Sequence, residues 1–189
     1  LLEKHYAIFK KREIKEIYKK ASKIDVKQVK NFTSLKNLKF FEFPKLGFKE
    51  LDKMITKVTK LKGGLIFIDY GYLGSINKST LQSVRRHKKN NLLENLGKAD
   101  ITSLVNFDLL GEYLKKNSLK VKKVSSQKFF LERMGIIERA NIISKKMSFR
   151  AQTNLYLRLK RLLDSKSMGS LFKVIFAYKN NNNKIQGFE

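Results

Sequence analysis

The chain of 189 residues contains no cysteine and a single proline, Pro44. Without cysteine it has no disulfides, no thiolate nucleophile and no zinc site with sulfur ligands, which fits a reducing compartment. No apolar run approaches the roughly 18 residues that a membrane-spanning helix needs, so we expect no membrane insertion. The first residues, LLEKHYAIFKK, also lack the order of a signal peptide, in which charge precedes the apolar stretch.

The motifs of several common enzyme classes are missing as well. The ten glycines form neither a G-x-G-x-x-G fingerprint nor a P-loop. The two histidines, His5 and His87, are too few for a metal cluster, and no serine stands in a nucleophile elbow. We therefore expect no metal centre, and the sequence shows no phosphate-binding loop and no serine nucleophile.

Acidic residues are scarce, since 16 Asp and Glu stand against 42 Lys and Arg and give a net charge of +26. Such a balance raises the question of nucleic-acid binding. However, 34 of the basic residues are Lys and only 8 are Arg, beside 14 Asn, and they spread along the whole chain. Arg is the side chain that recognises bases and phosphates with a bidentate fork. A general drift toward Lys and Asn explains this composition with fewer assumptions, so we expect no specific nucleic-acid partner.

A hydrophobic content of 42% with 11% aromatic residues is typical of a globular protein, and the length suits one domain. The stretch from Gly63 to Ser75, GGLIFIDYGYLGS, has the densest apolar run. It predicts a strand buried on both faces, as in a parallel sheet. Asp69, Tyr70 and Gly71 then lie at the carboxyl end of the strand, where open α/β sheets bind ligands. An equally weighted alternative is that Asp69 caps the next turn and Tyr70 only packs.

Apolar spacing predicts the other elements along the chain. Residues 1–12 are compatible with a strand or a helix. The predicted helices are Glu13 to Ala21, Phe48 to Leu61, Asn106 to Lys116, Gln127 to Met134 and Ile136 to Leu163. The predicted strands besides the central one are Leu38 to Phe43, Leu119 to Val124 and Ser170 to Tyr178; a long irregular segment covers 72–102 and an Asn-rich, flexible tail covers 180–189.

Six motifs stand in a particular order along the chain: GGLIFIDYG, STLQSVRRH, GKADITSLVNF, SQKFFLERMGIIERA, RLKRLL and MGSLFKV. Together they resemble the MidA-type methyltransferases. These are S-adenosylmethionine-dependent enzymes whose mitochondrial members act as complex I assembly factors by methylating arginine on a subunit of that complex. The resemblance extends from about Leu38 to Phe188.

The resemblance implies an α/β fold, the C-terminal part of a class I (Rossmann-like) methyltransferase sheet with a helical insertion. The strand after Gly63 would be the fifth. Leu119 to Val124 would be the sixth and Ser170 to Tyr178 the seventh, antiparallel between the other two. The implied domains are a variable excursion with a helix leading into strand five (1–62), the C-terminal half of the methyltransferase domain (63–179) and the flexible tail (180–189).

The resemblance also implies S-adenosylmethionine as cofactor of the full-length protein. In the family, the glycine-rich cofactor loop and the acid for the ribose precede the point where this chain begins, so its cofactor-binding residues are unknown. The chain does not start with Met, and we expect a fragment that is inactive alone. The implied partner is a protein substrate such as a complex I subunit, with a homo-oligomer also compatible. The implied location is the bacterial cytoplasm or the mitochondrial matrix.

Candidate site residues follow from the strand end and from the resemblance. Asp69 would position the acceptor or the cofactor, with Tyr70 beside it and Gly71 allowing the turn. The predicted substrate-binding residues on the long connection are Arg85, His87, Asp100 and Thr102. Their structural alternatives are that Asp100 and Thr102 cap the next helix and that Arg85 pairs with a carboxylate. Two further functions stay open: a basic, non-catalytic module that binds RNA or an acidic protein partner, and an inactive pseudo-enzyme retained as a partner of another chain.

Overall fold

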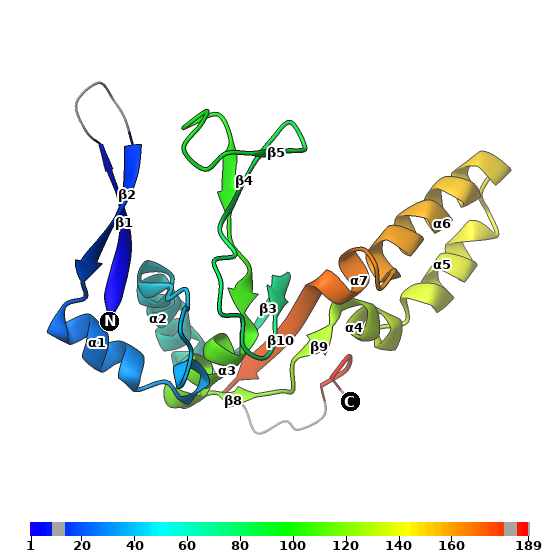
Figure 1. Ribbon diagram of the computed structural model, residues 1–189. Coiled ribbons are helices and arrows are strands. Elements are labelled where there is room, and N and C mark those ends of the chain that lie inside the picture. Colours follow the sequence, from blue (N-terminus) through cyan, green and yellow to red (C-terminus); the bar gives the residue numbers. More distant parts are fainter. Residues whose placement is uncertain (9–13, 180–184, 189) are drawn as a thin grey trace. The chain divides into compact units, whose positions relative to one another are not determined.

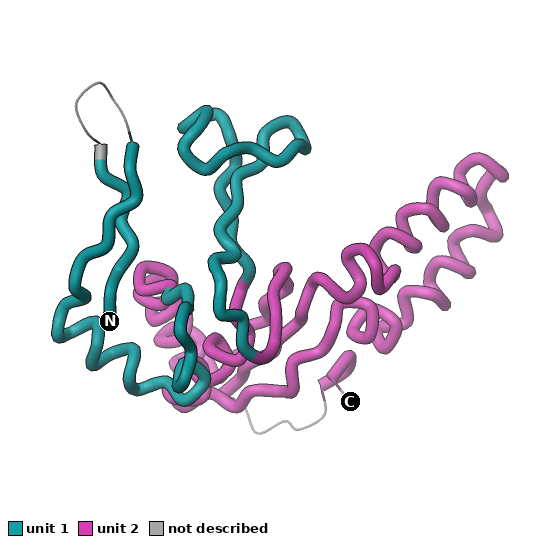
Figure 2. The backbone as a smooth tube through the Cα atoms, in the orientation of Figure 1, with its two compact units in different colours: residues 1–43, 75–104 teal, residues 44–74, 105–189 magenta. Residues whose placement is uncertain are grey.

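The computed structural model describes residues 1–8, 14–179 and 185–188. The chain forms a mixed α/β structure (Figure 1) and divides into two compact units (Figure 2). Unit 1 contains Leu1–Phe43 and Ser75–Leu104, and unit 2 contains Pro44–Gly74 and Val105–Glu189. Each unit is described separately below.

Unit 1 begins with an antiparallel hairpin of β1 (Leu2–Ile8) and β2 (Ile14–Lys20). The helix predicted from Glu13 to Ala21 is therefore wrong over its described part, and Glu13 itself lies outside the described residues. The spacing of Ile14, Ile17 and Tyr18 suits a helix, but pairing with β1 decides the conformation. The ammonium of Lys4 lies 2.6 Å from the carboxylate of Glu16 across this pair.

Two short helices follow in unit 1, α1 (Lys23–Lys30) and the 3-10 helix η2 (Thr33–Leu35). The Ser22 hydroxyl caps α1 by accepting a hydrogen bond from the Asp25 amide at 3.0 Å. Phe32 and Leu35 are buried. The strand predicted from Leu38 to Phe43 is wrong, because this segment joins no sheet in the described part of the chain.

The second sheet of unit 1 has the strand order β5-β4-β6, with antiparallel pairs. Its strands are β4 (Gln82–Arg85), β5 (Lys88–Asn90) and β6 (Asp100–Thr102). The segment predicted as irregular thus contains a small sheet. The turn between β4 and β5 has Arg86 and His87 at φ 48° and 62°. Tight hairpin turns of this kind usually carry Asn and Gly, so no turn signature marked it.

The main sheet of unit 2 has the order β7-β3-β10-β8, and β9 also pairs with β10. β10 is antiparallel to β3 and β8, whereas β7 is parallel to β3. The strands are β3 (Gly64–Tyr72), β7 (Val105–Asn106), β8 (Lys120–Val121), β9 (Ser125–Ser126) and β10 (Phe172–Tyr178). The strand after Gly63 is confirmed, but its predicted burial on both faces is wrong. Ile66 and Ile68 are 49% and 46% exposed, because the antiparallel β10 is its main neighbour and one face is uncovered.

Two predicted helices of unit 2 are confirmed as α2 (Lys45–Lys60) and α3 (Phe107–Lys116). The Asn106 side chain caps α3 by accepting a hydrogen bond from the Leu109 amide at 3.0 Å. Phe107 and Leu114 are fully buried, and the rings of Phe48 and Tyr113 stack with centroids 3.8 Å apart. These contacts join α2 and α3 in the core of the unit.

Four helices form the predicted helical insertion: α4 (Gln127–Arg133), α5 (Ile136–Ser144), α6 (Phe149–Leu163) and α7 (Met168–Leu171). The helix predicted over Ile136 to Leu163 is two helices that form a hairpin (Figure 1). The Gln152 amide group donates to the carbonyls of Ser144 and Met147 at 3.0 and 3.1 Å, which satisfies the end of α5. Of the tail, residues 180–184 and 189 lie outside the described residues. The ring of Phe188 packs on Phe130 and Phe176, at 5.2 and 5.7 Å between centroids.

Candidate functional site

The carboxyl end of β3 carries the predicted acidic and aromatic pair. One carboxylate oxygen of Asp69 accepts a hydrogen bond from the Tyr70 amide at 2.8 Å, and the Asp69 side chain is exposed. The Tyr70 ring meets Phe172 of β10 edge-on, with centroids 5.6 Å apart. Tyr70 therefore packs within the sheet, while the Asp69 carboxylate stands at its surface.

Gly71 is required for close packing inside the strand. A side chain there would collide with the Val105 carbonyl oxygen of β7 and would bring a Cβ within 2.7 Å of the Phe107 ring. The turn after β3 has its left-handed residue at Gly74, with φ 80°. The Gly74 amide donates to the Asp108 carboxylate at 2.6 Å. Gly71 thus allows β7 and α3 to approach β3, and the turn comes later.

Lys173 of β10 joins this group, although sequence reasoning did not select it. It pairs with Asp69 on β3 and with Ser126 on β9, so the three side chains project to the same face of the sheet. Its ammonium donates a hydrogen bond to the Ser170 carbonyl, and burial lowers the pKa of Lys173. The signal in the sequence was a single lysine inside an otherwise apolar strand.

Arg85 and His87 belong to the β4–β5 hairpin of unit 1. The Arg85 guanidinium donates to the Asn95 side-chain oxygen at 2.6 Å. The alternative in which a carboxylate binds Arg85 receives no support from this contact. Asn95 donates to Asn90 at 2.9 Å, and Asn90 donates to the hydroxyl of the buried Ser83 at 3.0 Å. This chain of amides holds Arg85, whereas His87 is exposed in the turn.

Asp100 and Thr102 lie on β6, opposite Val84 and Gln82 of β4. The alternative in which they cap the following helix is wrong, because Asn106 caps α3. Their register places them on one face of the small sheet, and the alternation of strand residues places Arg85 on the other. The substrate-binding candidates therefore share a sheet without forming a single cluster.

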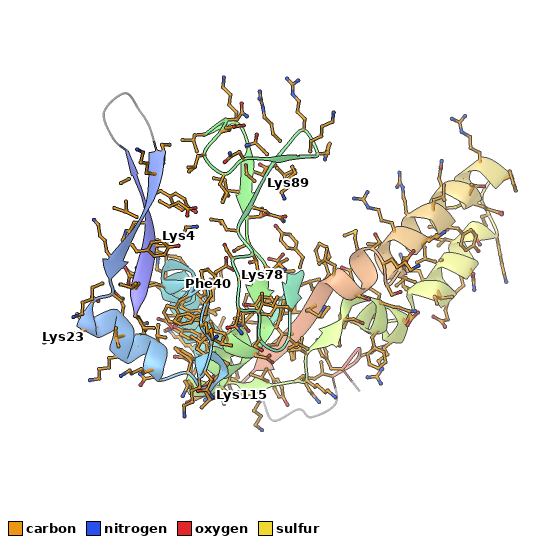
Figure 3. All side chains as sticks on the ribbon, in the orientation of Figure 1. Lys4, Lys23, Phe40, Lys78, Lys89 and Lys115 are labelled. Atoms are coloured by element: carbon orange, nitrogen blue, oxygen red, sulfur yellow. The ribbon has the colours of Figure 1, made fainter. Side chains whose placement is uncertain are left out.

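The seven predicted site residues fall into two groups. Asp69, Tyr70 and Gly71 form a contiguous end of β3 in unit 2, where Lys173 joins them. The other four belong to the small sheet of unit 1, with Arg85, Asp100 and Thr102 on its strands and His87 in the β4–β5 turn. Lysines are exposed on both units, among them Lys23, Lys89 and Lys115 (Figure 3).

Glu42 organises the long connection of unit 1, which the sequence did not predict. Its carboxylate accepts hydrogen bonds from the amides of Thr80 and Leu81, at 2.9 and 3.2 Å, and from the hydroxyls of Ser79 and Thr80. The Thr80 hydroxyl also accepts a hydrogen bond from the Leu104 amide at 2.9 Å. In the sequence, the only indication of this role is that Glu42 is a single acidic residue between two phenylalanines.

Gly71 opens no space for a ligand beside Asp69. The space beside Gly71, the glycine nearest to Asp69, is filled by Val105 and Phe107. No group of three His, Asp or Glu side chains that could hold a metal ion occurs among the described residues. In the same part of the chain, no helix is long and apolar enough to cross a membrane.

Two curated proteins are similar to the chain. It is 28% identical over 123 residues to the mitochondrial protein arginine methyltransferase NDUFAF7 homolog of Caenorhabditis elegans. It is also 28% identical over 124 residues to the mitochondrial protein arginine methyltransferase NDUFAF7 of Xenopus tropicalis. Each alignment covers 65% of this chain, and the chain spans 28% of the length of each relative.

Two crystal structures from Burkholderia thailandensis share the fold. An uncharacterized protein of the COG1565 superfamily has a TM-score of 0.83 at 18% identity, over 99% of this chain and 51% of its own. A COG1565 member described as a likely methyl transferase, bound to S-adenosyl-homocysteine, has a TM-score of 0.73 at 20% identity, over 99% and 49%. At these identities the likeness establishes the fold, and the chain spans about half of each structure.

A family model covers more than half of the chain. It carries the description "Putative S-adenosyl-L-methionine-dependent methyltransferase" and matches residues 9–125, which include β3, the small sheet of unit 1 and α3. S-adenosyl-L-methionine is the cofactor that this family uses. With that match, the chain belongs to the family of S-adenosyl-L-methionine-dependent methyltransferases.

Proposed function

We propose that the chain supplies the acceptor side of a methyltransferase that modifies arginine on a protein substrate. The observation that carries this proposal is the exposed carboxylate of Asp69 at the carboxyl end of β3, in a chain of this family. Both curated relatives are named protein arginine methyltransferases. The substrate class comes from those names and from the fit of a carboxylate to a guanidinium.

In this proposal β3, β8 and β10 are the fifth, sixth and seventh strands of a class I sheet. The antiparallel position of β10 between β3 and β8 supports that assignment. The open edge of β3 supports it too. Among the described strands, β7 pairs with β3 only at Gly71 and Tyr72, so the edge from Gly64 to Tyr70 has no partner strand. We assign that edge to the segment that carries the cofactor-binding loop.

The residues of this chain would orient the acceptor. A carboxylate such as that of Asp69 matches the planar donors of a guanidinium and holds it through charge-assisted hydrogen bonds. Fixing the acceptor nitrogen in line with the methyl group is the main contribution an enzyme makes to such a displacement. Asp69 also provides a base near the proton that the guanidinium releases. The cofactor supplies the methyl group, and its binding residues belong to the segment beside β3.

The surroundings of Asp69 suit this role. Tyr70 is fixed by Phe172, so the backbone that donates to the Asp69 carboxylate is held in place. Lys173 stands on the same face but donates to the Ser170 carbonyl. Its ammonium is therefore engaged by a carbonyl of α7 while the Asp69 carboxylate is exposed. A complex I subunit is the proposed substrate, and the mitochondrial matrix or the bacterial cytoplasm is the proposed location.

The test uses the protein encoded by the longest reading frame that contains the chain. It is incubated with methyl-labelled S-adenosylmethionine and candidate protein substrates, and the labelled residue is identified by mass spectrometry. We expect methylarginine, with a rate on the order of a hundredfold lower for Asp69→Asn, as for loss of a general base. Glu50→Gln, at an exposed carboxylate of α2, is the matched control and should leave the rate unchanged.

Two results would contradict the proposal. One is a wild-type protein that binds the cofactor but labels no protein arginine. The other is an Asp69→Asn variant that is as fast as Glu50→Gln. For the chain of 189 residues alone we expect no tight cofactor binding, and a micromolar dissociation constant by calorimetry would show that it holds a complete cofactor site.

A further inference from the structure

Arginine is concentrated in one part of a chain that otherwise uses lysine. Four of the eight arginines, Arg139, Arg150, Arg158 and Arg161, lie on α5 and α6. No acidic residue occurs between Arg139 and Leu163. A drift toward lysine acts on the whole chain and does not explain arginines kept on one pair of helices. The α5–α6 hairpin, residues 136–163, therefore differs in charge chemistry from the rest of the molecule.

The same hairpin exposes large apolar side chains. Ile142 of α5 is 67% exposed, and Phe149 and Leu157 of α6 are 85% and 60% exposed. Helix α6 has no buried residue at all. Its inward stripe of Leu155, Leu159 and Leu162 is half-buried. The hairpin thus uses one apolar stripe for its own packing and presents further apolar groups outward.

Hydrogen bonds hold the hairpin in shape. Besides Gln152 at the turn, the Tyr156 hydroxyl donates to the Asn141 side chain at 3.2 Å and lies 3.3 Å from the Ser144 hydroxyl. At the base of the hairpin, the Gln127 amide group donates to the Leu162 carbonyl at 3.0 Å. A surface that is already ordered loses little conformational entropy when a partner binds.

The arrangement of the exposed groups indicates the kind of partner. Leu157 stands seven residues after Arg150 and four before Arg161, so on the helix it lies between two guanidinium groups. Helices that lie on membranes separate their charged and apolar faces. Interleaved arginine and large apolar side chains are instead typical of protein interfaces.

Phe149 is the one strongly exposed aromatic ring of the hairpin, whereas Ile142 and Leu157 are aliphatic. Tyr156 is 43% exposed and its hydroxyl is hydrogen-bonded to Asn141. A row of aromatic rings on which successive bases could stack is therefore missing from the described hairpin, which disfavours RNA.

The positive charge of the hairpin decides between the two occupants that remain, a second copy of the chain and a different protein. A second copy docked through the same face would oppose arginines to arginines, because a two-fold interface uses the same patch on both chains. We propose that the α5–α6 hairpin is a docking surface for an acidic, amphipathic segment of a partner protein, whose apolar side chains contact Ile142, Phe149 and Leu157. Its carboxylates would accept bidentate hydrogen bonds from Arg150 and Arg161. This surface is separate from the site at Asp69 and does not depend on methyl transfer.

The test measures binding of a synthetic amphipathic helix of about 18 residues, long enough to be helical, with leucines on one face and glutamates elsewhere. Fluorescence anisotropy gives its dissociation constant with the full chain. Two double variants change the hairpin: Arg150→Glu with Arg161→Glu reverses two of its charges, and Phe149→Ser with Leu157→Ser removes two of its apolar groups. We expect each double variant to weaken binding on the order of tenfold or more. The matched controls on α2 are Lys49→Glu with Lys60→Glu, and Leu46→Ser at a side chain that is 77% exposed.

The controls should leave the dissociation constant within about twofold, as expected of positions outside an interface. Equal losses in the controls would show attraction by net charge alone and overturn the proposal. The proposal also fails if a peptide with serine in place of leucine binds equally well. It fails again if an RNA oligonucleotide or an anionic vesicle binds more tightly and loses binding through the same hairpin substitutions. All substituted side chains are exposed, so we expect the variants to fold. If a double variant does not fold, the single variant Leu157→Ser replaces it in the binding test.

Discussion

Tyr113 shows how one buried group links two helices. Its hydroxyl donates to the Asp52 carboxylate and lies 3.2 Å from the Phe48 carbonyl oxygen, while its ring stacks on Phe48. Burial, together with the hydrogen bond and the charge of Asp52, raises the pKa of Tyr113 well above its ordinary value. α2 and α3 are therefore joined by a contact whose strength depends on pH.

We expect Tyr113→Phe to lower the free energy of unfolding by about 1 kcal/mol at neutral pH, the contribution of a typical hydrogen bond. The native chain keeps the Tyr113 proton above pH 10, where the unfolded chain loses it. The stabilisation is therefore present below that pH and is lost as the pH rises further. Urea unfolding at neutral pH and above pH 10 should show a shallower alkaline loss in the variant. Tyr18→Phe, at a side chain that is 63% exposed, should match the wild type.

Lys173 has the opposite dependence on pH. Burial lowers its pKa, so between that value and the ordinary 10.5 the unfolded chain binds a proton that the native chain has lost. Its contribution to stability rises with pH in that window. We expect Lys173→Met to unfold at higher urea than the wild type at neutral pH, with a difference that narrows as the pH rises toward 10.5. A difference that stays constant across this range would contradict the effect of burial.

Gly71 matters for the contact between elements, since β7 and α3 both meet β3 there. We expect Gly71→Ala to destabilise the chain by about 1–3 kcal/mol, because the new methyl group meets backbone at Val105 and the Phe107 ring, which cannot easily move. Gly63→Ala is the matched control, since a Cβ there meets nothing within 4 Å. Thermal unfolding of both variants measures the difference. Equal melting temperatures would show that β7 adjusts without loss.

The elements differ in how far local sequence controls them. The helix α2 follows from apolar spacing, and α3 and α4 follow from apolar spacing together with the capping side chains of Asn106 and Ser126, all of which act within a few turns. The hairpin β1–β2 and the sheet β5-β4-β6 depend on pairing between segments. The local pattern left β1 open between strand and helix, predicted a helix at β2 and predicted an irregular segment where the small sheet lies. The break between α5 and α6 likewise has no glycine or proline, and Gln152 stabilises it from within the next helix.

At the scale of the whole molecule, β3 has an open edge among the described strands and an exposed apolar face with Ile66 and Ile68. Unpaired edges of this kind promote association with other chains. We expect the chain of 189 residues to self-associate, and Ile66→Lys with Ile68→Lys to reduce light scattering and shift gel filtration toward the monomer. Ile24→Lys on α1, at a side chain that is 77% exposed, is the control and should change neither. A wild-type chain that is monomeric and unfolds cooperatively would contradict this expectation.

The sequence by itself determined the family, through the order of six motifs. It also determined the central strand with Asp69 at its end, the helices α2, α3 and α4 and the final strand, because each of these elements depends on residues close together along the chain. Tertiary structure decided what no local pattern contains. It placed Lys173 opposite Asp69, filled the space beside Gly71, tied the long connection to Glu42 and paired Leu2–Ile8 with Ile14–Lys20 as strands. In each case the partner lies far along the chain, or the pairing of a neighbouring strand outweighs local propensity.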